Sequence, residues 1–251
     1  MRCLDLFSGI GGFSLGLEAA GYETAAFCEV EPYARKILKK HWPEIPIYED
    51  IRKLTADRLA ADGIGIDVIC GGFPCQDIST SGHQKGIDGE KSGLWGEMCR
   101  LVRELRPQYV IVENVSALLY NGLSRVLGDL AAIGYDAEWH CIPASAVGYD
   151  HGRDRIWIVA YPEGSRRGSI LQESELLQET LARCARSADR CRTFYCPNTN
   201  RLLRETEPGV DRVADGVPDR IHRLRLLGNA VVPGIPELIG RAILACEKES
   251  I

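Results

Sequence analysis

The chain has 251 residues, of which 45% are hydrophobic and 26% charged, with a formal net charge of −5 at pH 7. This is the composition of an ordinary globular protein, and the length fits about one to one and a half domains. The composition excludes a mainly disordered chain, and the net charge gives no general indication of nucleic-acid binding.

Arginine dominates the basic residues, and after Lys91 the only lysine is Lys248. Arginine suits contacts to phosphate and guanine, but a GC-rich genome produces the same bias, so both explanations stay open. No window approaches the roughly 18 uncharged apolar residues of a membrane span. The N-terminal apolar stretch contains Asp5 and is too short for a secretory signal. We therefore expect a cytoplasmic protein without a membrane partner.

The first 160 residues alternate short apolar runs with helical patterns. Strands are expected over Arg2–Phe7, Glu23–Glu29, Ile45–Tyr48, Asp67–Cys70, Tyr109–Glu113, Tyr135–Ile142 and Arg155–Ala160. Helices are expected after Gly12 through Ala20 and over Pro32–His41, Thr55–Ala61, Trp95–Leu105 and Ser124–Ile133. This alternation predicts an α/β fold with a mostly parallel, doubly wound sheet. The close spacing of the last two strands predicts an antiparallel hairpin at one edge.

The composition changes after Ala160. Residues 161–222 are rich in Arg, Glu, Ser and Pro, with one expected helix over Ile170–Ala188. Globular character returns in Leu226–Cys246, where we expect a turn at Gly228-Asn229 and a helix through Ala245. We therefore expect one domain from 1–160 and 223–251, with 161–222 as a separate region.

A glycine-rich turn, Ser8–Gly12, follows the first strand and opens the first helix. Glycines allow the backbone to approach a ligand closely at a helix N-terminus. The NAD fingerprint fails at its last position, which is Ser14, but Glu29 ends the second strand where a carboxylate can bind a ribose diol. Asp50 follows the third strand, within reach of an adenine amino group. The series predicts a nucleoside cofactor.

Cys75 ends the fourth strand at the edge where open α/β sheets bind ligands. The long polar stretch Gln76–Gly96 behind it is typical of a lid, and a cysteine beside a lid is a candidate nucleophile. Glu113 ends the fifth strand at the same edge. Arg153 and Arg155 begin a later strand, which would start at that edge if it runs antiparallel.

These segments resemble the motifs of the cytosine-C5 DNA methyltransferase family, in the family's order. The matching segments are DLFSGIGGFSLGL, FCEVEPYA, YEDI, GGFPCQDISTSGHQKG, VIVENV, HGRDRIWIV and LGNAVVP. They cover about three quarters of the chain, and the compact size is similar to short forms carried by phages and prophages. The resemblance implies a Rossmann-like fold that binds S-adenosyl-L-methionine.

The resemblance also implies residue roles. Cys75 would attack cytosine C6, Glu113 would bond the N3 and N4 edge, and Arg155 would bond O2, with Arg153 as a supporting catalytic group. The implied cofactor-binding residues are Phe7, Gly9, Gly11, Gly12, Glu29, Asp50, Ile51, Pro74, Asn229 and Ala230. The implied DNA-binding residues are Gln76, Ser79, Ser81, Gln84 and Lys91.

The implied partner is double-stranded DNA in a bacterial or phage-infected cell, bound by a monomer. Whether a cognate restriction endonuclease exists stays open. The chain departs from the family at His151, where glutamine is usual, and at Lys91, where arginine is usual. The region 161–222 is short for a target-recognition domain, which favours a recognition sequence of about two to four base pairs containing guanine.

Several alternatives stay open. Cys184, Cys191 and Cys196 could suggest a zinc knuckle, but the spacing lacks a CxxC pair, and reduced thiols without a metal are expected. The chain could also be a catalytically silent nucleic-acid-binding relative or an RNA cytosine-C5 methyltransferase. The catalytic set Cys75, Glu113 and Arg155 argues against the first. The absence of a Cys-Phe-Thr signature between Ala160 and Gly228 argues against the second.

Overall fold

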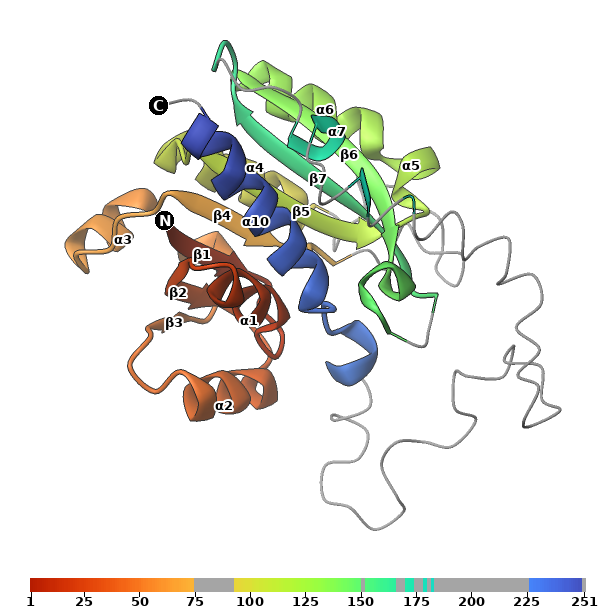
Figure 1. The fold of residues 1–251 in the computed structure, drawn as a ribbon. Helices are drawn as coiled ribbons and strands as arrows, with labels where there is room; N and C mark the ends of the chain where they lie inside the picture. The colour runs from red at the N-terminus through yellow and green to blue at the C-terminus, as the bar shows by residue number, and fades with distance from the viewer. Residues whose placement is uncertain are drawn as a thin grey trace, which may run out of the picture.

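A computed structural model describes residues 1–74, 93–149, 152–165, 170–173, 178–179, 182 and 226–249. Its centre is a seven-stranded sheet with the order β3-β2-β1-β4-β5-β7-β6 (Figure 1). The strands are β1 (Arg2–Leu6), β2 (Glu23–Cys28), β3 (Ile47–Tyr48), β4 (Val68–Gly71), β5 (Tyr109–Val115), β6 (Tyr135–Pro143) and β7 (Asp154–Pro162). The first five are parallel, and β7 runs antiparallel between β5 and β6. The expected α/β fold and edge hairpin are confirmed.

Helices cover both faces of the sheet. The α-helices are α1 (Gly12–Ala19), α2 (Pro32–His41), α3 (Ala56–Ala61), α4 (Leu94–Leu105), α5 (Leu118–Asn121), α6 (Leu123–Ala132), α7 (Ile170–Glu173) and α10 (Gly234–Glu249). Two 3-10 helices are η1 (Ile51–Lys53) and η3 (Ala144–Val147). Helices α1, α7 and α10 pack on one face, with α1 and α10 in front in Figure 1, and α3, α4 and α6 pack on the other.

Strand β5 shows why the sheet is apolar on both faces. Successive side chains of a strand point to opposite faces. Tyr109 and Ile111 belong to the apolar cluster of α1 and α10, whereas Val110 and Val112 belong to the cluster of α4 and α6. All four are fully buried, so this strand lies in the middle of the molecule. Glu113 and Asn114, which follow on the same strand, are thereby fixed in position.

Helix α1 and the segment before α10 are in backbone contact. A Cβ on Gly16 would lie 2.1 Å from the Pro233 carbonyl oxygen, and one on Gly12 would lie 2.5 Å from that of Val231. Only glycine allows this approach. The contact brings the C-terminal segment to the glycine-rich turn near the opposite end of the sequence.

The structure differs from the sequence predictions in its short and C-terminal elements. The turn expected at Gly228-Asn229 is wrong, because residues 226–229 are helical. Helices α5 and η3 were not expected, and α10 ends at Glu249 rather than Ala245. Most of the helix expected over 170–188 lies outside the described residues.

One described helical stretch, Leu226–Lys248, is long and apolar enough by composition to cross a membrane, with a mean hydropathy of 1.2. It is interrupted at residues 230–233. Ile235, Ile239 and Ile243 are buried in the core beside α1. We therefore interpret α10 as a core helix.

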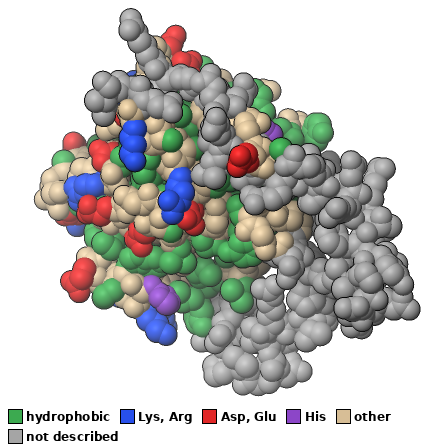
Figure 2. Space-filling view, in the orientation of Figure 1, with side chains coloured by type: hydrophobic (Ala, Val, Ile, Leu, Met, Phe, Trp, Pro, Cys, Tyr) green, Lys and Arg blue, Asp and Glu red, His purple; other side chains and the backbone are tan. Residues whose placement is uncertain are grey.

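Charges of both signs are interspersed on the face seen in Figure 2, and apolar side chains gather in its lower half. Among the described residues, some charged side chains form pairs within single helices, such as Arg58 with Asp62 and Arg125 with Asp129. Exposed pairs of this kind contribute little to stability. This face therefore carries no large patch of one sign among its coloured residues.

Candidate active site

The carboxyl ends of β1, β2, β4 and β5 meet at one edge of the sheet. Because β7 is antiparallel, it begins at this edge, with Arg155 opposite Val115 of β5. This confirms that the start of the arginine strand lies at the rim formed by the parallel strands. Open α/β sheets bind ligands at this edge, so the edge is the candidate site.

The turn after β1 has an unusual backbone. Phe7 (φ 54°) is one of two non-glycine residues with positive φ in the described ranges, and Gly9 and Gly11 also have positive φ. The Ser8 hydroxyl donates a 2.6 Å hydrogen bond to the Asp5 carbonyl oxygen. A left-handed backbone at a bulky residue is strained and is often found where a ligand binds.

Glu29 fixes this turn to the end of β2. Its Oε2 accepts a 2.7 Å hydrogen bond from the Gly9 N–H, and its Oε1 accepts one of the same length from the Glu31 N–H. The residue is only 8% exposed. Each carboxylate oxygen keeps a further lone pair, so Glu29 can still accept hydrogen bonds from a ligand hydroxyl.

Asp50 stands at the start of η1, with the buried side chain of Ile51 next to it. The Asp50 carboxylate accepts hydrogen bonds from the backbone N–H and the guanidinium of Arg52, with an ion-pair distance of 2.9 Å. This contact lowers the pKa of Asp50, mainly through the side-chain hydrogen bond. Asp50 is therefore an anion that already has one partner.

Glu113 and Arg155 form an ion pair at the edge, with 3.1 Å between Oε1 and Nε. Burial raises the pKa of Glu113, while Arg155 and Arg153 act in the opposite direction. The pKa of Arg153 is lowered, mainly by burial and to a smaller extent by the positive charge of Arg155. A buried carboxyl group with a raised pKa, held beside a cation, is suited to donating a proton.

The loop after β4 packs directly against Glu113. A Cβ on Gly72 would lie 2.8 Å from Glu113 Oε2. The Asn114 side chain donates a 3.2 Å hydrogen bond to the Phe73 carbonyl, and the Phe73 ring lies 5.5 Å from that of Trp95. The chain is thus held against β5 as far as Phe73, one residue before Pro74, the last described residue of this loop.

The C-terminal segment reaches the same edge. The Arg153 guanidinium donates a hydrogen bond to the Gly228 carbonyl, one residue before Asn229. The Ala230 N–H donates to the Leu227 carbonyl at 3.3 Å. Asn229 is exposed, and the segment after it packs on Gly12. Both expected C-terminal residues therefore lie beside the glycine-rich turn and the start of β7.

Some expected site residues lie outside the described residues, namely Cys75, Gln76, Ser79, Ser81, Gln84 and Lys91. The same holds for His151 and for Cys184, Cys191 and Cys196. Within the described part of the chain, no group of three or more His, Cys, Asp or Glu side chains could hold a metal ion.

Comparison with known families decides the classification. The family described as C-5 cytosine-specific DNA methylase matches residues 1–194. The chain belongs to this methylase family. The match covers the glycine-rich turn, Glu29, Asp50, the Glu113–Arg155 pair and residues 161–194 of the region after Ala160.

Curated relatives of the methylase family match about two thirds of the chain. The type II methyltransferase M2.BsuMI of Bacillus subtilis is 34% identical over 168 residues, which are 64% of this chain and 42% of the relative. The type II methyltransferase M.HhaI of Haemophilus parahaemolyticus is 32% identical over 165 residues, 64% of this chain and 49% of the relative. The chain thus spans less than half the length of these relatives.

Solved structures show the same fold at lower identity. One solved structure is described as a DNA modification methyltransferase encoded within an E. coli prophage. It aligns with a TM-score of 0.68 at 18% identity over 99% of both chains. The Dnmt2 methyltransferase of S. pombe aligns with a TM-score of 0.57 at 19% identity, over 72% of this chain and 54% of that one. The sheet is therefore a Rossmann-like methyltransferase fold.

Two polar residues at the site of this methylase were not among the site residues predicted from the sequence. Asn114 ties the loop after β4 to β5, and Asp5 lies fully buried under the glycine-rich turn. The Ser14 hydroxyl donates to Asp5 Oδ2 at 2.8 Å, while Oδ1 has no hydrogen-bond partner among the described residues. The only sequence signal for Asp5 is its position as an aspartate within an apolar strand.

We predict that Asp5 makes stability fall as pH rises. Burial raises its pKa to about 8, so between the ordinary carboxyl value and about pH 8 the folded protein binds more protons than the unfolded chain. The free energy of unfolding should fall by up to about 1.4 kcal/mol per pH unit in this window. Asp5→Asn should flatten this dependence in urea titrations between about pH 5 and pH 8. Parallel curves for both proteins would contradict the prediction.

Proposed function

We propose that the protein is an S-adenosyl-L-methionine-dependent DNA methyltransferase that modifies C5 of cytosine through a covalent bond to Cys75. The observation that carries the proposal is the ion pair of the buried Glu113 with the half-buried Arg155, beside the loop that leads into Cys75. It supplies a proton donor and a cation next to the expected nucleophile. Membership of the methylase family supports the same reaction.

The residues at the glycine-rich turn fit the cofactor. A Cβ on Gly9 would meet no atom of the described residues within 4 Å, so this part of the chain leaves space beside the Gly9 backbone. Glu29 beside it offers carboxylate lone pairs for ribose hydroxyls, and the exposed Val30 and half-buried Phe7 offer apolar contacts for adenine. Asp50 and Ile51 would lie at the adenine edge. When bound, S-adenosyl-L-methionine supplies the methyl group.

The target cytosine must first leave the duplex stack, at a cost of a few kcal/mol. Residues of this chain then act on its ring. The Cys75 thiolate forms a bond to C6, and the ring electron pair becomes available at C5. Glu113 donates a proton or strong hydrogen bond to N3, and Arg155 hydrogen-bonds O2. After C5 is methylated, loss of the C5 proton and release of the Cys75 thiolate restore the ring.

We further propose that residues 1–160 and 223–251 form the catalytic domain and that 161–222 read the target. The backbone contact between α1 and the segment before α10 supports the first part. The partner would be double-stranded DNA, bound by a monomer in the cytoplasm. The type II relatives raise the question of a cognate restriction endonuclease in the same cell.

Incubation with tritiated S-adenosyl-L-methionine and separate DNA and RNA pools tests the function. We expect label in DNA as 5-methylcytosine, and bisulfite sequencing of plasmid DNA then gives the site. Label confined to RNA would favour the RNA methyltransferase. DNA binding without label would favour the silent relative, and either result would overturn the proposal.

Substitutions at the proposed cofactor site should change the affinity for S-adenosylhomocysteine. Glu29→Ala should weaken S-adenosylhomocysteine binding by roughly 1–3 kcal/mol, because it removes charged hydrogen bonds to the ribose and frees the Gly9 backbone. Asp50→Ala should have a smaller effect, since Arg52 already engages that carboxylate. Calorimetric titration measures both, and Glu49→Ala, whose side chain is 74% exposed, is the control. Unchanged affinity in Glu29→Ala and Asp50→Ala would show that the site is misplaced.

A further inference from the structure

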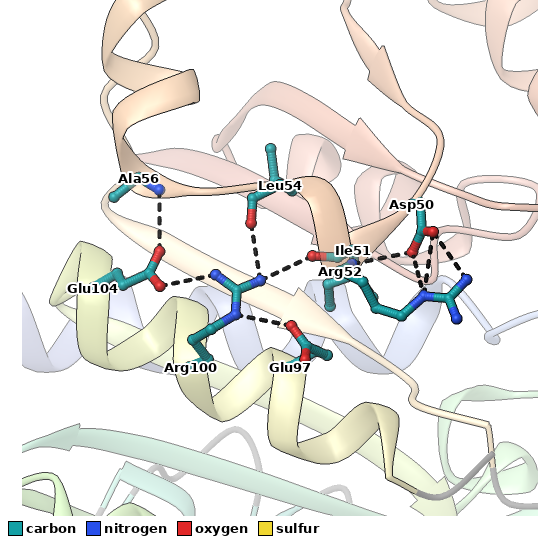
Figure 3. Close-up of polar contacts among 8 residues, drawn as sticks. All are labelled: Asp50, Ile51, Arg52, Leu54, Ala56, Glu97, Arg100 and Glu104. Carbon is teal, nitrogen blue, oxygen red and sulfur yellow. Dashed lines mark hydrogen bonds and ion pairs between the residues drawn. The ribbon is translucent and has the colours of Figure 1, made fainter. Parts of the chain in front are cut away.

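Helix α4 holds the segment that carries Asp50 and Ile51 through one arginine (Figure 3). Arg100 Nη2 donates 2.9 Å hydrogen bonds to the carbonyl oxygens of both Ile51 and Leu54. These two carbonyls lie at the start of η1 and just after its end. The guanidinium therefore spans the whole turn and holds it against α4.

Two carboxylates on α4 fix the orientation of this guanidinium. Glu97 accepts from Arg100 Nε and Glu104 accepts from Nη1, each at 2.8 Å. The other oxygen of Glu104 accepts a 3.2 Å hydrogen bond from the Ala56 N–H. Figure 3 shows these contacts side by side along one face of α4. Only the planar fork of arginine can make all four bonds at once.

The segment needs this support because its own elements are short. It lies between the two-residue strand β3 and the six-residue helix α3. Ile51 is buried in the core beside α4, whereas the Asp50 carboxylate faces Arg52. A lost donor to two part-buried carbonyls would allow the turn to shift, and Asp50 and Ile51 would shift with it.

We propose that Arg100 is a positioning residue for the adenine subsite, which sets the place of Asp50 and Ile51 without touching the cofactor. This rests on the proposed function, in which those two residues meet the adenine edge. Arg100 thus determines how well the site distinguishes adenine from a purine without the amino group. It acts on cofactor affinity and not on the chemical step.

The test compares S-adenosylhomocysteine with its deaminated analogue, S-inosylhomocysteine, by calorimetry. We expect the wild type to prefer the amino compound. Arg100→Gln should weaken S-adenosylhomocysteine binding about tenfold and lose most of this preference. The KM for S-adenosyl-L-methionine should rise by a similar factor, while kcat at saturation and the KM for DNA stay within about twofold. Arg100→Lys, which keeps the charge but lacks the fork, should recover only part of the preference.

Arg241→Gln is the matched control. Arg241 pairs with Glu237 one turn away and donates to the Ala19 carbonyl, so it also ties a helix to a neighbouring segment, but on the α1 and α10 face. It should leave the ligand preference unchanged. If Arg100→Gln does not fold, Glu104→Ala, which removes the acceptor of both Arg100 and the Ala56 N–H, replaces it.

The outcomes separate the two proposals. If the wild type binds neither compound, the proposed function fails. If the wild type binds S-adenosylhomocysteine but prefers neither compound, or if the Arg100 and Glu104 variants keep wild-type affinity and preference, the role of Arg100 is wrong. An equal loss in the Arg241 control would also overturn it, since the effect would then be one of general stability.

Discussion

Replacement of Cys75 by serine is expected to abolish methyl transfer. A thiolate is accessible near neutral pH, whereas a serine hydroxyl would need a strong base to attack C6. Among the described residues, five cysteines are poor candidates, because burial raises the pKa of Cys70 well above its ordinary value and that of Cys28 to about 12. Burial also raises the pKa of Cys3, Cys99 and Cys141.

DNA containing 5-fluorocytosine gives the direct measurement of this attack. Fluorine cannot leave C5 as a proton does, so the wild type should remain bonded to the DNA after methyl transfer. The adduct should depend on S-adenosyl-L-methionine, resist denaturant and map to Cys75 by mass spectrometry. Cys141→Ser, at a half-buried position on β6, should still form it. An adduct in Cys75→Ser, or none in the wild type, would refute covalent catalysis by this residue.

The sheet could be predicted from sequence because its signals are local. Strand β5 is a continuous apolar run, as expected for a strand buried on both faces, and Pro32 and Thr55 mark the starts of α2 and α3. The order of the motifs along the chain then placed Glu29, Asp50 and Glu113 at one edge. Parallel strands bring their ends together whatever the connections between them.

The remainder depends on contacts between segments far apart in the sequence. The helical turn at 226–229 was missed because the glycine and asparagine there favour a turn. In the folded chain the Gly228 carbonyl instead accepts a hydrogen bond from Arg153, 75 residues earlier. The role of Arg100 likewise has no local sequence signal, since its carbonyl partners at Ile51 and Leu54 are 49 and 46 residues away.

The Glu113–Arg155 pair links this fold to the proposed chemistry. Residue Glu113 comes from a parallel strand and Arg155 from the antiparallel β7, so the pair forms only because β7 is inserted beside β5. Of the two, the carboxyl group has the larger expected effect on rate, because it is the proposed proton donor. Burial keeps more of it protonated near neutral pH than an exposed glutamate would be.

We therefore predict that Glu113→Gln lowers kcat by on the order of 10²–10⁴-fold, since glutamine can hydrogen-bond N3 but cannot transfer a proton. Affinity for S-adenosylhomocysteine should stay within about twofold, because Glu113 lies outside the cofactor residues. The acid form of Glu113 is the active one, so wild-type kcat should fall as pH rises through its raised pKa. This alkaline limb should be absent in Glu113→Gln. Glu23→Gln, whose side chain is 69% exposed, should keep wild-type rates and the limb. Wild-type kcat in Glu113→Gln would show that the proton at N3 comes from elsewhere.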